Sequence, residues 1–187
     1  MLSKLQLVII LGFIVALAIV INVPHLYNNS VTYEPDFEVS ENTFYVAQNQ
    51  NEASNDNNGL YPFYIGGNNG PFKDLNFNKD KLPLNGGFRV ILREGYYKVP
   101  DNGLHIFQSG KNNERIVISS YESERAVIDS NDNDIGLRLD VSFITIRNLE
   151  IRNSKIYNVQ IKSRNIEIIY NKIHDRYEDN IKILSTA

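Results

Sequence analysis

Short runs of alternating apolar and polar residues fill the C-terminal half of the chain. Residues 144–146 have the sequence Ile-Thr-Ile, and residues 181–183 have the sequence Ile-Lys-Ile. A period of two places alternate side chains on opposite faces of a strand, whereas an amphipathic helix needs apolar spacings of three and four. The pattern therefore predicts short β-strands that each have one apolar face.

Residues 142–163 align with residues 164–185 at an offset of 22 residues. The aligned positions share residue identity or apolar character: Ile144 with Ile166, Ile146 with Ile168, Ile151 with Ile173, Val159 with Ile181, Ile161 with Ile183, Asn158 with Asn180, and Ser163 with Ser185. Each repeat holds three alternating segments. Stacking such units at a fixed period is typical of a parallel β-helix, in which neighbouring coils bury each other's apolar side chains.

Two earlier and less regular coils are predicted upstream of this tandem repeat. Their apolar pairs are Ile116 and Ile118, Ala126 and Ile128, and Leu137 and Leu139 in one coil, and Val90 and Leu92 with Leu104 and Ile106 in the other. Insertions in a solenoid go to loops between strands. The predicted fold class is all-β: a right-handed parallel β-helix of about four coils, with three strands per coil, over residues 89–187.

The N-terminus has a different pattern. Residues 5–23 are nearly all apolar and are long enough to cross a bilayer, and Lys4 precedes them. A transmembrane helix within residues 1–23 is predicted, with residues 24–42 as a linker and the domain outside the cytoplasm. A cleaved signal peptide, which would give a secreted domain, is the alternative. The apolar run continues past the Ala-Leu-Ala at residues 16–18, which favours an uncleaved anchor.

Residues 43–88 are predicted to form a strand and cap region. Residues 43–46 favour a strand, and residues 71–75 begin with Pro71, which is typical of the start of a short helix. At the other end, the sequence stops at Ala187 in a strand-like segment with no capping segment. Because an open strand edge invites pairing, we expect end-to-end self-association or a longer parent protein.

Overall charge and composition exclude several function classes. The chain has 19 basic and 22 acidic residues and a net charge of −3, so it has no overall basic field to hold nucleic acid. It has no cysteine, which excludes disulfides, thiolate metal sites and a cysteine nucleophile.

Five segments, four of which contain predicted strands, carry a resemblance to a known family: residues 44–46, 71–73, 90–97, 116–121 and 124–129. Together they resemble the N-terminal part of chondroitinase B and alginate lyase type polysaccharide lyases and related pectate-lyase-like proteins, over residues 43–185. The resemblance implies the β-helix fold and an acidic polysaccharide as substrate. Those enzymes usually continue for more coils and carry their catalytic groups in the middle, whereas this sequence stops at Ala187. The resemblance therefore implies a truncated member, an end covered by another subunit, or a longer gene product.

One outward column of the predicted β-helix has the chemistry to bind an acidic polysaccharide. It contains His105, Arg138, Gln160 and Lys182, with Lys162 at the end of its strand. Arginine suits bidentate carboxylate binding, and lysine acts as a point charge. Lys182 is a candidate for the catalytic base of a lyase, a role that would require a lowered pKa. Solvated positions on a strand face are the alternative interpretation of the whole column.

Two other polar clusters are candidates. Asp129, Asp132 and Asp134 supply the oxygen ligands that Ca²⁺ prefers, although Asp and Asn are also common turn residues. Residues 174–176, with Glu178 and Asp179, form either a small acid/base site or a polar corner of the coil.

Three functions remain open from the sequence. The first is a membrane-tethered β-helix that handles polysaccharide, including a truncated lyase. The second is a non-enzymatic surface protein with a structural or adhesive role, and the third is a sugar epimerase on the same scaffold.

Overall fold

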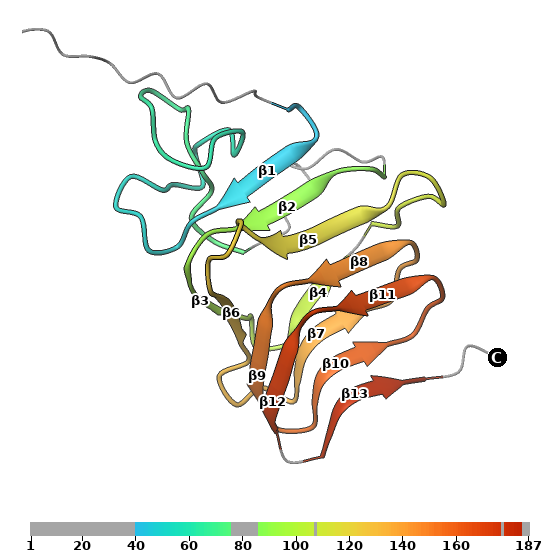
Figure 1. Ribbon diagram of the computed structural model, residues 1–187. Helices are drawn as coiled ribbons and strands as arrows, with labels where there is room; N and C mark the ends of the chain where they lie inside the picture. Colours follow the sequence, from blue (N-terminus) through green and yellow to red (C-terminus); the bar gives the residue numbers. More distant parts are fainter. Residues whose placement is uncertain (1–39, 76–85, 107, 177, 185–187) are drawn as a thin grey trace, which may run out of the picture. The chain divides into compact units, whose positions relative to one another are not determined.

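The computed structural model describes residues 40–75, 86–106, 108–176 and 178–184 (Figure 1). These residues form an all-β parallel solenoid of about four turns. Its strands are β1 (Thr43–Val46), β2 (Arg89–Leu92), β3 (Gly95–Lys98), β4 (Leu104–Ile106), β5 (Ile116–Ser120), β6 (Ala126–Asp129), β7 (Ile135–Leu139), β8 (Ile144–Arg147), β9 (Glu150–Ser154), β10 (Tyr157–Ile161), β11 (Ile166–Ile169), β12 (Lys172–Arg176) and β13 (Asp179–Ile183).

Every turn of the solenoid contributes one strand to each of three parallel sheets. The sheets have the orders β1-β2-β5-β8-β11, β3-β6-β9-β12 and β4-β7-β10-β13, and Figure 1 shows their strands stacked one above another. Residues 22 apart pair between the last two turns, as Ile144 does with Ile166. The predicted parallel coils with three strands each are therefore confirmed, together with the register of the tandem repeat.

Columns of stacked aliphatic side chains form the core between the three sheets. Ile144 pairs with Ile116 on one side and with Ile166 on the other, and both Ile116 and Ile144 are fully buried. Burial is lost in the last described turn: Ile161 is 7% exposed, whereas its stacking partner Ile183 is 71% exposed. The turn of β11, β12 and β13 therefore has one covered and one uncovered side.

Single residues in the left-handed conformation turn the chain at each corner of the last two coils. They repeat at the 22-residue offset: Phe143 and Asn165, Asn148 and Tyr170, and Asn153 and Asp175, with φ between 54° and 62°. Asparagine and aspartate tolerate this conformation, whereas an aromatic residue pays a steric penalty in it. Two of these corner residues, Phe143 and Tyr170, are aromatic, and each aligns with an asparagine in the neighbouring coil.

The N-terminal strand is part of the solenoid, because β1 pairs in parallel with β2. The expected short helix in residues 71–75 is wrong. Phe72 forms a parallel bridge with Val46, and its backbone N–H donates to the carbonyl of Tyr45 at 2.9 Å. The extended backbone lets the Phe72 ring pack in the core beside Phe44, so tertiary packing overrides the local helix-start signal.

Strand β3 was absent from the predicted first coil. Its inward position Tyr97 is almost completely buried, and its hydroxyl lies 2.8 Å from the carbonyl oxygens of both Val46 and Arg93. Because tyrosine is amphipathic and Gly95 has no side chain, the segment lacks the aliphatic alternation that marks the other strands. The first coil therefore has the same three strands as the later ones.

The part of the chain that the structure describes has no helix long and apolar enough to cross a membrane. The predicted anchor in residues 1–23 and the linker up to residue 39 lie outside the described residues.

Candidate functional site

The predicted outward column lies on the sheet β4-β7-β10-β13. His105 pairs with Arg138, Arg138 with Gln160, and Gln160 with Lys182, so four successive coils contribute one residue each. Lys162 follows β10 and is exposed. The pairing register thus aligns the side chains that the sequence pattern selected.

Contacts within the protein occupy much of this column. His105 Nε2 lies 3.2 Å from Asp140 Oδ2. Lys182 Nζ lies 3.6 Å from Asp179 Oδ2 and 5.7 Å from the centroid of the Tyr157 ring. Gln160 is buried. The column is therefore aligned, with His105 and Lys182 paired to aspartates, whereas Arg138 Nε and Gln160 Oε1 are buried without a hydrogen-bond partner among the described residues. Its role in binding stays a prediction.

The acidic loop after β6 is a hydrogen-bonded turn. Asp129 Oδ2 accepts from Arg152 Nε at 3.1 Å and from Asn153 Nδ2 at 2.9 Å, and its Oδ1 accepts from the backbone N–H of Asn131 at 2.9 Å. Asp132 takes a left-handed conformation in this turn, and Asp134 accepts backbone hydrogen bonds through its carbonyl. No group of three potential metal-ligating side chains gathers among the described residues. A calcium site here stays a prediction.

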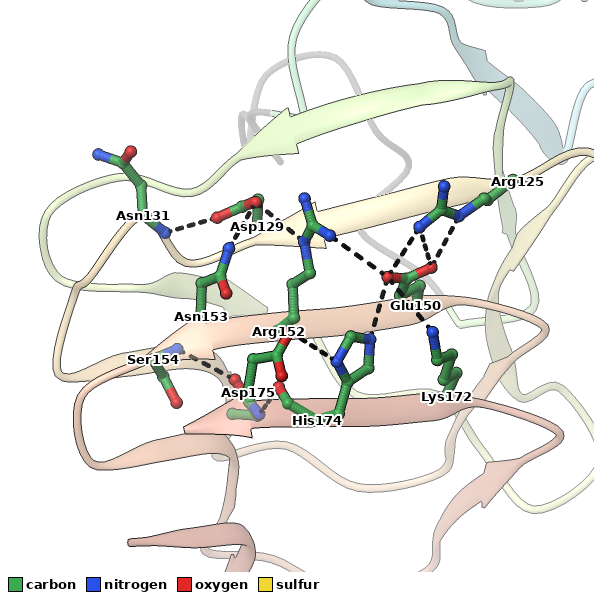
Figure 2. Close-up of polar contacts among 11 residues, drawn as sticks. Arg125, Asp129, Asn131, Glu150, Arg152, Asn153, Ser154, Lys172, His174 and Asp175 are labelled. Carbon is green, nitrogen blue, oxygen red and sulfur yellow. Dashed lines mark hydrogen bonds and ion pairs between the residues drawn. The ribbon is translucent and has the colours of Figure 1, made fainter. Parts of the chain in front are cut away.

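A denser polar cluster lies on the outer face of the sheet β3-β6-β9-β12 (Figure 2). The register places Tyr96, Val127, Glu150 and Lys172 in one outward column. The adjacent column contains Lys98, Asp129, Arg152 and His174. On this face, the sequence analysis had identified only Asp129 and the corner at residues 174–176 as candidates.

Glu150 is the centre of the cluster. Arg125 donates to it from Nε at 2.8 Å and from Nη2 at 3.0 Å, and His174 Nε2 lies 3.0 Å from its Oε1. Arg152 and Lys172 lie farther away, at 3.6 Å and 4.0 Å. The hydrogen bonds from Arg125 outweigh the effect of burial and, with His174 and Lys172, lower the pKa of Glu150 to about 2. The carboxyl group is therefore ionised at neutral pH and has no proton to donate.

His174 is held between two carboxylates. Its Nε2 faces Glu150, and its Nδ1 lies 2.8 Å from Asp175 Oδ2. Asp175 is the left-handed corner residue that follows it in β12. Both ring nitrogens are thus engaged inside the protein, and this arrangement holds the ring in place instead of presenting a free nitrogen to a substrate.

Tyr96 forms a half-exposed aromatic surface beside the cluster. The guanidinium carbons of Arg152 and Arg125 lie 5.3 Å and 5.9 Å from the centroid of its ring, within the range of cation–π contacts. The ring is 49% exposed. One tyrosine face is therefore oriented by two arginines, and part of the ring stays accessible to a ligand.

Two adjoining hollows follow the corner where this sheet meets the sheet β1-β2-β5-β8-β11. One has a volume of about 290 Å³ and reaches from Asn49 and Gln50 to Tyr96, and the other has a volume of about 570 Å³ and reaches Tyr170 and Lys172. Both are lined by Glu124 and Arg125. Together they form a strip from Tyr96 to Tyr170, called the corner groove below, which runs across the successive coils.

Glu124, between the two hollows, is also held as a carboxylate. Burial disfavours its charged form, but hydrogen bonds from Arg93 and from the backbone N–H of Glu94 outweigh burial, so the pKa of Glu124 is lowered. The acidic groups at the centre of the groove are thus counter-ions of fixed arginines.

No protein-family model and no curated protein matches this chain significantly.

Proposed function

We propose that this protein is a right-handed β-helix that binds an acidic polysaccharide along the corner groove, and that its N-terminal segment tethers it to a membrane outside the cytoplasm. The observation that supports this proposal most directly is a row of exposed side chains along one groove: Tyr96, Arg125, Lys172 and Tyr170. Tyrosine rings pack on the apolar faces of sugar rings, and arginine and lysine bind carboxylate or sulfate groups.

Tyr170 supplies independent support for a binding role. Its side chain is 87% exposed, and its φ is 55°. A strained conformation for an aromatic residue persists when a function requires it. Asn148, at the same corner of the previous coil, fills this position without that cost. Phe143 shares the left-handed conformation, so the exposure of the Tyr170 ring beside the groove is what supports a binding role.

Binding without cleavage fits the cluster better than acid/base catalysis. The arginine pairs keep Glu150 and Glu124 ionised, and both nitrogens of His174 face carboxylates. A glycosidic bond needs a proton donor for its leaving group. These fixed groups serve instead to orient Arg125 and Arg152 beneath a ligand.

Binding to defined polymers tests this proposal. The full chain is titrated with alginate, pectate and chondroitin sulfate, with neutral dextran as the uncharged control. We expect binding to at least one acidic polymer, no binding to dextran, and weaker binding as the salt concentration rises, because charge attraction is screened. Tyr96→Ala should weaken binding at least tenfold.

Tyr64→Ala is the matched control, since Tyr64 is also an exposed tyrosine but does not line the groove. Equal weakening by both variants, or no binding to any acidic polymer, would contradict the proposal. The latter result would favour the structural or adhesive function.

The outward column supports a second candidate function, a lyase. Four coils align His105, Arg138, Gln160 and Lys182, and Arg138 Nε is buried without a hydrogen-bond partner in the described part of the chain. A lyase acting on uronates produces unsaturated ends that absorb ultraviolet light. Absorbance that rises with the natural chain, but not with Lys182→Ala, would establish that activity in place of binding alone.

The tether is tested separately by alkaline extraction of membranes. The full chain should stay in the membrane pellet, and a variant without residues 1–23 should not. A soluble product whose N-terminus begins after residue 23 would instead indicate a cleaved signal peptide.

A further inference from the structure

We propose a second, separate ligand site on the outer face of the sheet β1-β2-β5-β8-β11: a pocket for an oxyanion carried on a small ring-shaped group. The pocket has a volume of about 330 Å³. The pocket adjoins the corner groove and shares Ser120, Glu122 and Asn148 with it. The inference does not depend on the polysaccharide proposal, because none of the tyrosine and cationic side chains assigned to the groove lines this pocket.

The register of four neighbouring strands forms the base of this pocket. Tyr45 pairs with Ile91, and Ile91 with Ser119; Arg147 follows in the next coil. Tyr45, Ile91 and Ser119 are all buried, although they lie on the outward face of their strands. The pocket therefore has an apolar and hydroxyl-bearing floor, with Tyr121 packed edge-on against Tyr45 at one side.

Two arginines line the pocket without a carboxylate partner. In the described residues Arg93, Arg115, Arg125 and Arg152 each form an ion pair with a glutamate or aspartate. Neither Arg89 nor Arg147 does so within the same residues, and Arg147 Nε is buried with no hydrogen-bond partner. An unmade hydrogen bond at a buried donor costs stability, and more so for a charged group. An anion in the pocket would supply the missing acceptor.

The remaining polar lining suits an oxyanion. Thr43, Ser119, Ser120 and Tyr121 bring hydroxyl groups, and Glu122 is the acidic residue among the described lining residues. Arginine presents a planar fork of donors that matches carboxylate, sulfate and phosphate groups. Charge and donors together favour an anion over a cation.

The pocket is larger than a bare ion requires. Its volume is near the lower end of the range for small-molecule sites, which is about 300–1,000 Å³. Ile91 and Tyr45 offer an apolar surface beside the arginines. The chemical class that fits is a single sugar-sized ring that carries one sulfate, phosphate or carboxylate group.

Simple anions test the site on the full chain. Sodium sulfate, sodium phosphate and sodium acetate are each compared with sodium chloride at equal ionic strength, in thermal unfolding and in titration calorimetry. Because a ligand that binds only the folded state stabilises it, at least one of the three should raise the melting temperature more than chloride does. Arg147→Gln should weaken that anion's binding at least tenfold.

Arg164→Gln is the matched control, since Arg164 is exposed and does not line the pocket. Arg89→Gln is the second test variant, because Arg89 is exposed at the start of β2 and its replacement leaves the core intact. A response that tracks ionic strength alone, or an equal response in the natural chain and in both pocket variants, would overturn the proposal.

Ring-bearing ligands then identify the anion. Glucose 6-sulfate, glucose 6-phosphate and glucuronate are titrated in parallel, and the one that binds more tightly than its free anion gives the class. No gain for any ring would overturn the ring-shaped part of the proposal. Tyr96→Ala should leave these titrations unchanged, which separates this pocket from the corner groove.

Discussion

Arg125 and Glu150 are 25 residues apart and form a two-bond ion pair between neighbouring coils. Arg125 directly precedes β6, and Glu150 begins β9. The pair fixes a guanidinium at the middle of the corner groove, within reach of the Tyr96 ring. Because His174 and Arg152 also approach the same carboxylate, three coils are joined at one point.

Glu150 should make the folding stability depend on acidity. Its pKa falls from an ordinary value of 4.5 to about 2 on folding. The stabilisation is therefore fully present above pH 4.5 and is lost as the pH falls towards 2. Because the Arg125 side chain is 55% exposed and solvent screens the pair, the total at neutral pH is about 1–2 kcal/mol. Urea unfolding of Glu150→Gln should show a loss of roughly that size at pH 7 and a flatter profile between pH 4.5 and 2.

Glu114→Gln serves as the control for this experiment. Glu114 is exposed and pairs only loosely with Lys111, at 3.4 Å. This variant should keep the full acid dependence of the natural chain. An unchanged acid profile in Glu150→Gln would mean that Glu150 is not held by Arg125 in solution.

Replacing Tyr170 by asparagine should separate stability from binding. The left-handed conformation costs a tyrosine about 1 kcal/mol, and asparagine relieves that cost. We expect Tyr170→Asn to unfold at a higher urea concentration and to bind acidic polysaccharide more weakly. Tyr170→Ala removes the ring without supplying an asparagine, so it should weaken binding with a smaller gain in stability. Normal binding by the Tyr170→Asn variant would show that Tyr170 does not contribute to polysaccharide binding in the groove.

Asn158 should be needed for the stacking of the coils. It is fully buried, and its Nδ2 donates to the carbonyl of His174 at 2.7 Å and to Asn180 Oδ1 at 3.0 Å. Its Oδ1 accepts from the backbone N–H of Ser154 at 3.2 Å. Asn158→Leu should cost about 1–3 kcal/mol in urea unfolding, because these backbone groups lose their partner.

Asn180→Ala provides the comparison for Asn158→Leu. It removes only one of the three hydrogen bonds, so it should cost about 1 kcal/mol or less. Equal losses in the two variants would show that the hydrogen bond between Asn158 and Asn180, and not the bonds of Asn158 to the backbone, provides the stabilisation.

The apolar columns should contribute unequally along the solenoid. Ile151 is fully buried in the third turn, and Ile151→Ala should cost about 2–5 kcal/mol. Ile183 is exposed in the last described turn, so Ile183→Ala should cost less than 1 kcal/mol in dilute protein. A large and concentration-dependent loss for Ile183→Ala in sedimentation and unfolding would instead indicate that another copy covers this side of the last described turn.

The 22-residue repeat predicted most of the fold. Alternation at residues 144–146 and 181–183 predicted the strands, and the tandem alignment predicted that Ile144 stacks on Ile166, which the pairing confirms. Strand β3 was not predicted, because its spacing is less regular and its inward residue is Tyr97. The helix predicted at residues 71–75 from the local proline signal was wrong. Repetition is informative because stacked coils must present like side chains to one another.

Of the candidate sites, the sequence determined only the alignment of outward residues within a strand column. His105, Arg138, Gln160 and Lys182 could be aligned in advance because they share a register. The Arg125–Glu150 pair, the Tyr96 stack and the pocket between Arg89 and Arg147 could not. The first two depend on the corner residue Arg125. The pocket spans coils of different length, because Ile116 pairs with Ile144 at one spacing and Ile144 with Ile166 at another. Strand periodicity comes from local backbone geometry, whereas contacts between corners depend on loop lengths and side-chain reach, which only the folded chain decides.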